Sequence, residues 1–266
     1  MPALTRNSDV LGSAVRPADD AMPLARLENR LPPLLSIIAG MVDLTGFFTL
    51  GNIFTAHITG NLVVAAAAVV RGGPLNPAQL LAIPVFMLAL AAVWLAARAS
   101  GRTAQGLARL LLSVQCLLLT AVLIFSVLTK PSRDPHGLVA GIVAMIAVSA
   151  MACQYALFRL ALPGAVSTAV TTGNLSNSVL SLMDLLSKRH PLMTADRERL
   201  TRSMRLLAGF LFGCIIAAAA VSLLADWAWS FPVALAAAAI ALPEASEGLI
   251  RQTVKGWLRP NSRQIR

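Results

Sequence analysis

Hydrophobic residues are gathered into eight blocks along the chain, separated by short polar or turn-forming segments. Most blocks are close to the length of about 17–25 residues that an α-helix needs to cross a hydrocarbon core about 30 Å thick. Because a segment in lipid must satisfy its own backbone hydrogen bonds, the blocks predict helices and an all-α, multispanning membrane bundle. The blocks are residues 34–50, 55–70, 80–97, 107–129, 138–158, 166–186, 206–225 and 229–242.

Basic residues predict which blocks cross the membrane. They cluster in the N-terminal tail, at residues 98–109, at residues 188–205 and after residue 251. The positive-inside rule places all four clusters in the cytosol only if blocks 55–70 and 166–186 enter the membrane without crossing it. We therefore predict six spans plus two partial, re-entrant segments in a bacterial cytoplasmic (inner) membrane, with both termini cytosolic.

The same topology predicts the outer surface. Of the 22 Lys and Arg residues, only Arg71, Lys130 and Arg133 face outward in it. Trp227 and Trp229 fall at the outer interface, where indole rings favour the headgroup layer. The net charge of +10 is thus explained by topology and by attraction to anionic lipid. The chain contains no phosphate-binding loop or RNA-binding motif that would indicate a nucleic-acid partner.

The two halves of the chain share a motif. Residues 54–62 read FTAHITGNL and residues 167–175 read STAVTTGNL, which agree at six of nine positions. One copy follows an outward span and the other an inward span, so the halves are predicted to be inverted 3+3 repeats. The predicted parts are a disordered cytosolic tail (1–33), repeat A (34–129), inverted repeat B (130–243) and a basic cytosolic tail (244–266).

The shared motif predicts a binding site. Interrupted helices in inverted repeats typically meet near the membrane midplane, and a helix that starts there points its free amides at the site. The alternative is that both motifs only cap or pack helices at tight hairpins. The residues concerned are Thr59, Gly60, Asn61, Thr172, Gly173 and Asn174.

The motifs also resemble a known family. GMVDLTGF (residues 40–47) followed by FTAHITGN (54–61) resembles the signature of the YoaK-like family of bacterial inner-membrane proteins. The pattern in residues 154–174 is similar, although it departs from the family at Tyr155, where Asn is commoner, and at Asn174, where Thr is commoner. The resemblance covers almost everything except the tails. It implies a polytopic membrane protein with a domain of unknown function and supplies no substrate.

Asp43 and His57 are the ionisable residues of most interest within the blocks. A carboxylate in the middle of a span costs about 2.5–3.5 kcal/mol on insertion scales, so Asp43 is expected to face a cavity or a partner. An Asp–His pair near a helix break can exchange a proton at physiological pH. The alternative is a structural Asp43 that binds Thr or backbone groups, with His57 at the outer interface.

Other polar side chains fall inside the later blocks. Gln154 is predicted either to face Asp43 across the pseudo-twofold axis or to pair with a helix backbone. Asn174, Asn177 and Ser178 lie on one stripe of a helix, which either lines a wet path or bonds to a neighbouring helix.

The leading functional hypothesis is a small-solute transporter or channel with these residues near a central site, and with Asp43 as carrier if protons are coupled. The second is a non-transporting scaffold or sensor whose basic tails dock lipid or a partner. An intramembrane enzyme ranks last, because zinc-protease and nucleophile-elbow motifs are missing. The three cysteines stand singly and predict no metal, and no cofactor is expected. Homo-oligomers are compatible with the sequence.

Overall fold

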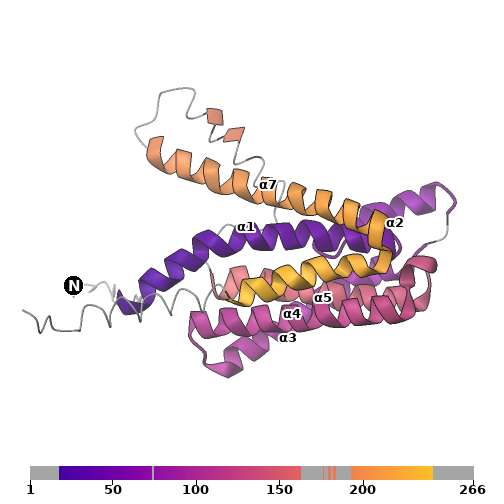
Figure 1. Ribbon diagram of the computed structural model, residues 1–266, viewed down its shortest axis with the longest axis horizontal. Coiled ribbons are helices and arrows are strands. Elements are labelled where there is room, and N and C mark those ends of the chain that lie inside the picture. Colours follow the sequence, from indigo (N-terminus) through magenta and orange to yellow (C-terminus); the bar gives the residue numbers. More distant parts are fainter. Residues whose placement is uncertain are drawn as a thin grey trace, which may run out of the picture.

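The computed structural model describes residues 18–73, 75–162 and 193–241, together with residues 176, 179, 180, 182 and 183. Within these residues the chain is helical and contains no strand (Figure 1). The elements are α1 (Ala18–Thr49), α2 (Gly60–Val70), α3 (Pro77–Ser100), α4 (Ala104–Thr129), η1 (Pro131–Arg133), α5 (Leu138–Leu160), α7 (Met193–Leu224) and η2 (Ala225–Trp229). A further helix covers residues 230–241.

Among the described residues, five helical stretches are long and apolar enough to cross a membrane. They are Arg30–Thr49, Pro77–Ser100, Ala104–Thr129, Leu138–Leu160 and Leu200–Ala241. The last stretch is divided at η2, where the chain reverses direction between α7 and the helix at 230–241 (Figure 1). The predicted all-α membrane bundle is confirmed. Most of block 166–186, including the second shared motif, lies outside the described residues.

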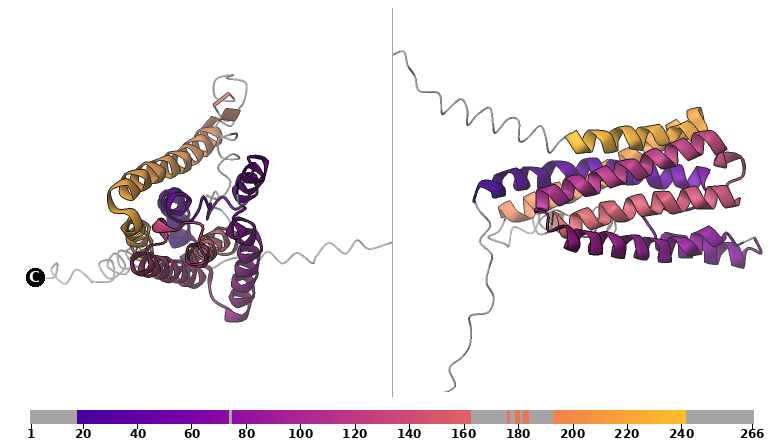
Figure 2. Two further views of the ribbon diagram at one scale, coloured as in Figure 1. Left: turned by 90° about the vertical axis from the view of Figure 1, so that its right-hand side faces the viewer. Right: turned by 90° about the horizontal axis from the view of Figure 1, so that it is seen from below.

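The long helices lie side by side, with α1 packed on α7, α5 packed on both α3 and α4, and α1 also in contact with α5 (Figure 2). The C-terminal end of α1, the turn at 71–76, η1 and η2 gather at one end of the bundle (Figure 1). Hydrogen bonds join these turns. Ser132 Oγ donates to Asp226 Oδ2 at 2.6 Å, and Asn76 Nδ2 donates to the Gly51 carbonyl at 3.0 Å.

Glycines allow α1 and α7 to pack closely. Gly40 on α1 faces the Phe210 carbonyl, and Gly213 on α7 faces the Ile37 carbonyl, with no room for a Cβ at either position. A Cβ on Gly209 would lie 3.0 Å from the Pro33 carbonyl oxygen. Gly209 and Gly213 are four residues apart, the small-xxx-small spacing that brings membrane helices together. The sequence analysis did not single out this motif.

The surface of α3 is suited to hydrocarbon. Met87 and Leu88 are 64% and 70% exposed, because no other described helix packs on that side of α3. The tryptophans at η2 differ from each other. Trp227 is 58% exposed, as an interfacial residue should be, whereas Trp229 is fully buried. The Trp229 indole donates to Thr49 Oγ1 at 3.3 Å, so this ring packs within the protein and is not exposed to headgroups.

Candidate functional site in the loop between α1 and α2

The loop that follows α1 turns back sharply at its first two residues. Gly51 and Asn52 have φ values of +78° and +59°, the left-handed conformation that Gly and Asn tolerate best. Leu50 and Ile53 on either side are fully buried and fix the turn in the core. Gly46, which lies on α1, lets the loop pack closely against this helix, because a Cβ there would come within 3.1 Å of the Ile53 carbonyl oxygen.

The loop then runs back beside α1 as far as Asp43. One carboxylate oxygen, Asp43 Oδ1, accepts from the Thr55 amide at 2.7 Å, the Ala56 amide at 2.6 Å and Thr55 Oγ1 at 3.2 Å. Six residues separate Asp43 from the end of α1 at Thr49, which corresponds to about 9 Å of helix. The loop therefore returns well into the bundle before α2 begins.

His57 completes the environment of the carboxylate. Its Nδ1 lies 2.5 Å from Asp43 Oδ2, and the ring packs edge-on against Phe210 of α7 with centroids 5.1 Å apart. The Asp43 side chain is only 4% exposed, whereas the His57 side chain is 32% exposed. The expected Asp43–His57 pair is thus present, and the carboxylate also binds Thr and backbone groups, as the structural alternative required.

Asn61 closes the loop on itself. Its Oδ1 accepts from the Phe54 amide and its Nδ2 donates to the Phe54 carbonyl, both at 2.7 Å. The sequence analysis expected α2 to start at Asn61, but it starts at Gly60 with Thr59 as the N-cap residue. Asn61 is fully buried and holds the loop instead of capping the helix. Gly60 leaves room for the Phe54 ring, which would lie 3.0 Å from a Cβ there.

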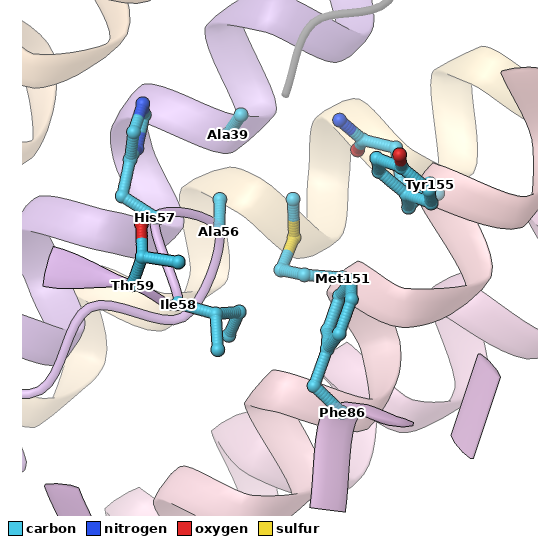
Figure 3. A pocket seen from close by; sticks show the side chains of 9 residues that line it. Ala39, Ala56, His57, Ile58, Thr59, Phe86, Met151 and Tyr155 are labelled. Atoms are coloured by element: carbon cyan, nitrogen blue, oxygen red, sulfur yellow. The ribbon is translucent and has the colours of Figure 1, made fainter. Parts of the chain in front are cut away.

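Beside the loop lies a cavity of about 220 Å³. His57 and Ala56 project into it from the loop (Figure 3). Met151 and Tyr155 come from α5, and Phe86 comes from α3. The lining is mainly apolar with a few polar groups, which is typical of small-molecule sites. The lining residues are Ala39, Ala56, His57, Ile58, Thr59, Phe86, Met151, Gln154 and Tyr155.

Gln154 connects this cavity to a buried polar chain. Its Nε2 donates to the Leu35 carbonyl of α1 at 3.0 Å, and its Oε1 accepts from Gln115 Nε2 of α4 at 2.7 Å. Of the two predicted roles for Gln154, the contact with a helix backbone is therefore the one observed. Gln115 is only 1% exposed and was missed, although an amide in the middle of block 107–129 was a visible signal.

Comparison with known proteins places the chain in a family. Residues 31–242 match the family described as "Protein of unknown function (DUF1275)". The chain belongs to this family. A stretch of 48 residues is also 44% identical to the UPF0700 transmembrane protein YoaK of Bacillus subtilis, covering 18% of this chain and 21% of that protein. The chain thus matches only about a fifth of this relative's length, and no solved structure matches it.

Membership in the DUF1275 family confirms the resemblance noted in the sequence and, with the apolar helices, a multi-pass membrane protein. It assigns no activity. In this family member, Thr172, Gly173, Asn174, Asn177 and Ser178 lie outside the described residues. The meeting of the two motifs therefore stays a prediction. Among the residues that the structure describes, no three His, Cys, Asp or Glu side chains group as metal ligands.

Proposed function

We propose that this protein moves a small solute across the bacterial cytoplasmic membrane, and that the solute binds in the cavity beside the loop between α1 and α2. The observation that carries the proposal is the loop itself, which runs as non-helical backbone beside Asp43 and lines that cavity. Irregular backbone at membrane depth is tolerated only where it is buried in protein or lines a water-filled space. A binding site explains why this chain has such a loop.

The topology that supports the proposal has six spans with residues 51–76 as a re-entrant segment. Both ends of that segment lie at one end of α1, because the Gly51 carbonyl accepts a hydrogen bond from Asn76 Nδ2. Arg71, Lys130 and Arg133 lie at this end and would face outward. The opposite end carries more basic residues, which the positive-inside rule assigns to the cytosol. Those among the described residues include Arg30, Arg98, Arg102, Arg109 and Arg159.

The lining favours a small uncharged solute. Burying an ion in a site of low dielectric is costly unless an opposite charge meets it. His57 is the only cavity-lining residue, among those described, that titrates near neutral pH, and Asp43 already provides its counter-charge. Thr59 and Gln154 supply hydrogen-bonding groups, while Phe86 and Met151 supply apolar contacts. The solute class that fits is a compact neutral molecule with a few hydroxyl or amide groups.

Vesicle flux tests this function. We would reconstitute the protein and measure uptake of radiolabelled glycerol, urea, acetamide and small polyols. For at least one solute, we expect uptake about tenfold faster than in protein-free vesicles. Ala39→Phe, which fills the cavity, should reduce this uptake about tenfold, whereas Leu88→Phe on the lipid-facing side of α3 should leave it unchanged.

The flux experiment has two further arms. If Ala39→Phe unfolds at a lower temperature than the wild type, Thr59→Trp replaces it, because Thr59 lines the cavity but is exposed. Uptake no faster than in empty vesicles for every solute would contradict the proposal, and so would full activity in both cavity variants. The competing scaffold hypothesis rests on the basic tails, most of which lie outside the described residues.

A further inference from the structure

We infer that the solute is coupled to a proton and that the Asp43–His57 pair binds this proton, with the imidazole as the exchanging group and Asp43 as the positioning group. The inference rests on the proposed function for the solute and adds the coupling ion. It also changes the role that the sequence analysis gave to Asp43, which was expected to carry the proton itself.

Asp43 is poorly placed to exchange a proton. Its Oδ1 accepts three hydrogen bonds, from the Thr55 amide, the Thr55 hydroxyl and the Ala56 amide. A proton added to that oxygen would point toward groups that are themselves donors. The other oxygen, Oδ2, faces His57, and the side chain is only 4% exposed. The geometry therefore makes Asp43 the acceptor that anchors the loop.

His57 has the properties that Asp43 lacks. It lines the cavity, its side chain is 32% exposed, and histidine changes its charge between about pH 5 and pH 8. The contact with Asp43 fixes the orientation of the ring, as a carboxylate does for a histidine ligand in many metal sites. Because the two groups are strongly coupled, the proton belongs to the pair as a unit.

The other described groups packed around His57 include a thiol, a phenol and aromatic rings. Phe210 and Cys214 of α7 pack near the pair, and the Cys214 thiol lies 3.6 Å from the Gly40 carbonyl. Across the cavity stand Tyr155 of α5 and Phe86 of α3. A thiol and a phenol ordinarily titrate above about pH 8. Asp43 is thus the charged group whose contact with His57 carries the inference.

Charge explains how the proton is coupled to the solute. Without the proton, the pair carries a net charge of minus one from the Asp43 carboxylate. A proton taken from water at one face converts His57 to imidazolium and makes the pair neutral overall. A bound solute displaces the water that would solvate this net charge, and an unsolvated charge in a site of low dielectric is costly, so the loaded site changes its access only when the proton is bound. The proton then returns to water at the other face, and no bond in the solute changes. The empty site is filled with water and returns without the proton.

The first test needs no solute. The protein is labelled with ¹⁵N-histidine and placed in lipid nanodiscs, with His136→Gln and His190→Gln so that only His57 gives a signal. We expect one titration of the imidazole between about pH 5 and pH 8. Asp43→Asn should move its midpoint by about one pH unit or more, and Asp43→Glu should restore part of this shift. An imidazole that keeps one protonation state throughout this range overturns the inference.

The second test uses vesicles that contain a pH-sensitive dye and a solute that passed the flux experiment. Adding this solute outside should acidify the lumen of wild-type vesicles and of vesicles with His136→Gln. With His57→Gln, the pH change should fall at least tenfold relative to solute uptake. Solute uptake by the wild type without acidification overturns proton coupling but leaves the proposed function standing. The absence of any solute uptake overturns both.

Discussion

Gly213→Ala tests the close packing that holds α7 against α1. A Cβ at Gly213 would run into the Ile37 carbonyl oxygen and lie 3.0 Å and 3.1 Å from the Ile37 carbonyl carbon and Cα. Ordinary contacts begin at 3.4 Å, so α7 must move outward by several tenths of an ångström or more. Overpacking of this kind typically costs about 1–3 kcal/mol. We expect a melting temperature lower by about 2–4 °C for each kcal/mol lost.

The matched control is Gly141→Ala on α5, where the new Cβ would meet the Ala78 Cβ at 3.4 Å, an ordinary contact. Because Ala favours a helix by about 1 kcal/mol over Gly, this variant should unfold at or above the wild-type temperature. Both variants are followed by near-ultraviolet circular dichroism in detergent micelles. If Gly213→Ala is as stable as Gly141→Ala, the glycines between α1 and α7 do not determine how closely these two helices pack.

Three further substitutions probe the polar contacts. Asn61→Ala leaves the Phe54 amide and carbonyl without their partner, which should lower the free energy of unfolding by about 1–3 kcal/mol for each group, measured by chemical denaturation. Gln154→Leu should destabilise more than the double variant Gln115→Leu/Gln154→Leu, because the single change strands the Gln115 amide; equal losses would contradict this reasoning. Asp226→Ala should release η1 from η2 and speed amide hydrogen exchange in η1, whereas unchanged exchange would show that this contact is unimportant.

Much of the fold could be predicted from the hydrophobic blocks, because the length of an apolar helix is set by the bilayer and visible in the sequence. Block 55–70 forms the short helix at 60–70, and Asn76 bonds to Gly51 at the C-terminal end of α1, but whether this segment is re-entrant stays a prediction. The α1–α7 contact could not be predicted, because small residues allow two helices to pack closely but do not determine which helices pair. The burial of Trp229 could not be predicted for a similar reason, since burial depends on tertiary contacts.

The candidate site was predictable in its residues but not in its geometry. Asp43 and His57 stood out because ionisable groups are rare in apolar blocks, and the structure brings them together. The different roles inferred for Asp43 and His57 depend on the backbone amides of Thr55 and Ala56, which bind the carboxylate. Every residue type except proline has such an amide, so the sequence could not indicate this contact. Asn61 was singled out as a helix cap but binds Phe54, because a one-residue shift in the helix start changes where its side chain points.

Cysteine accessibility tests most directly whether the loop lines a wet cavity within the membrane. In a variant whose native cysteines are replaced by alanine, Ile58→Cys is exposed to a membrane-impermeant thiol reagent. Arg133→Cys in the exposed turn η1 is the reactive control, and the unreactive controls are Val122→Cys in the packed core and Leu88→Cys on the exposed apolar face of α3. We expect Ile58→Cys to react at least tenfold faster than both unreactive controls. If it reacts no faster while Arg133→Cys is labelled, water does not reach the loop and the proposed site is wrong.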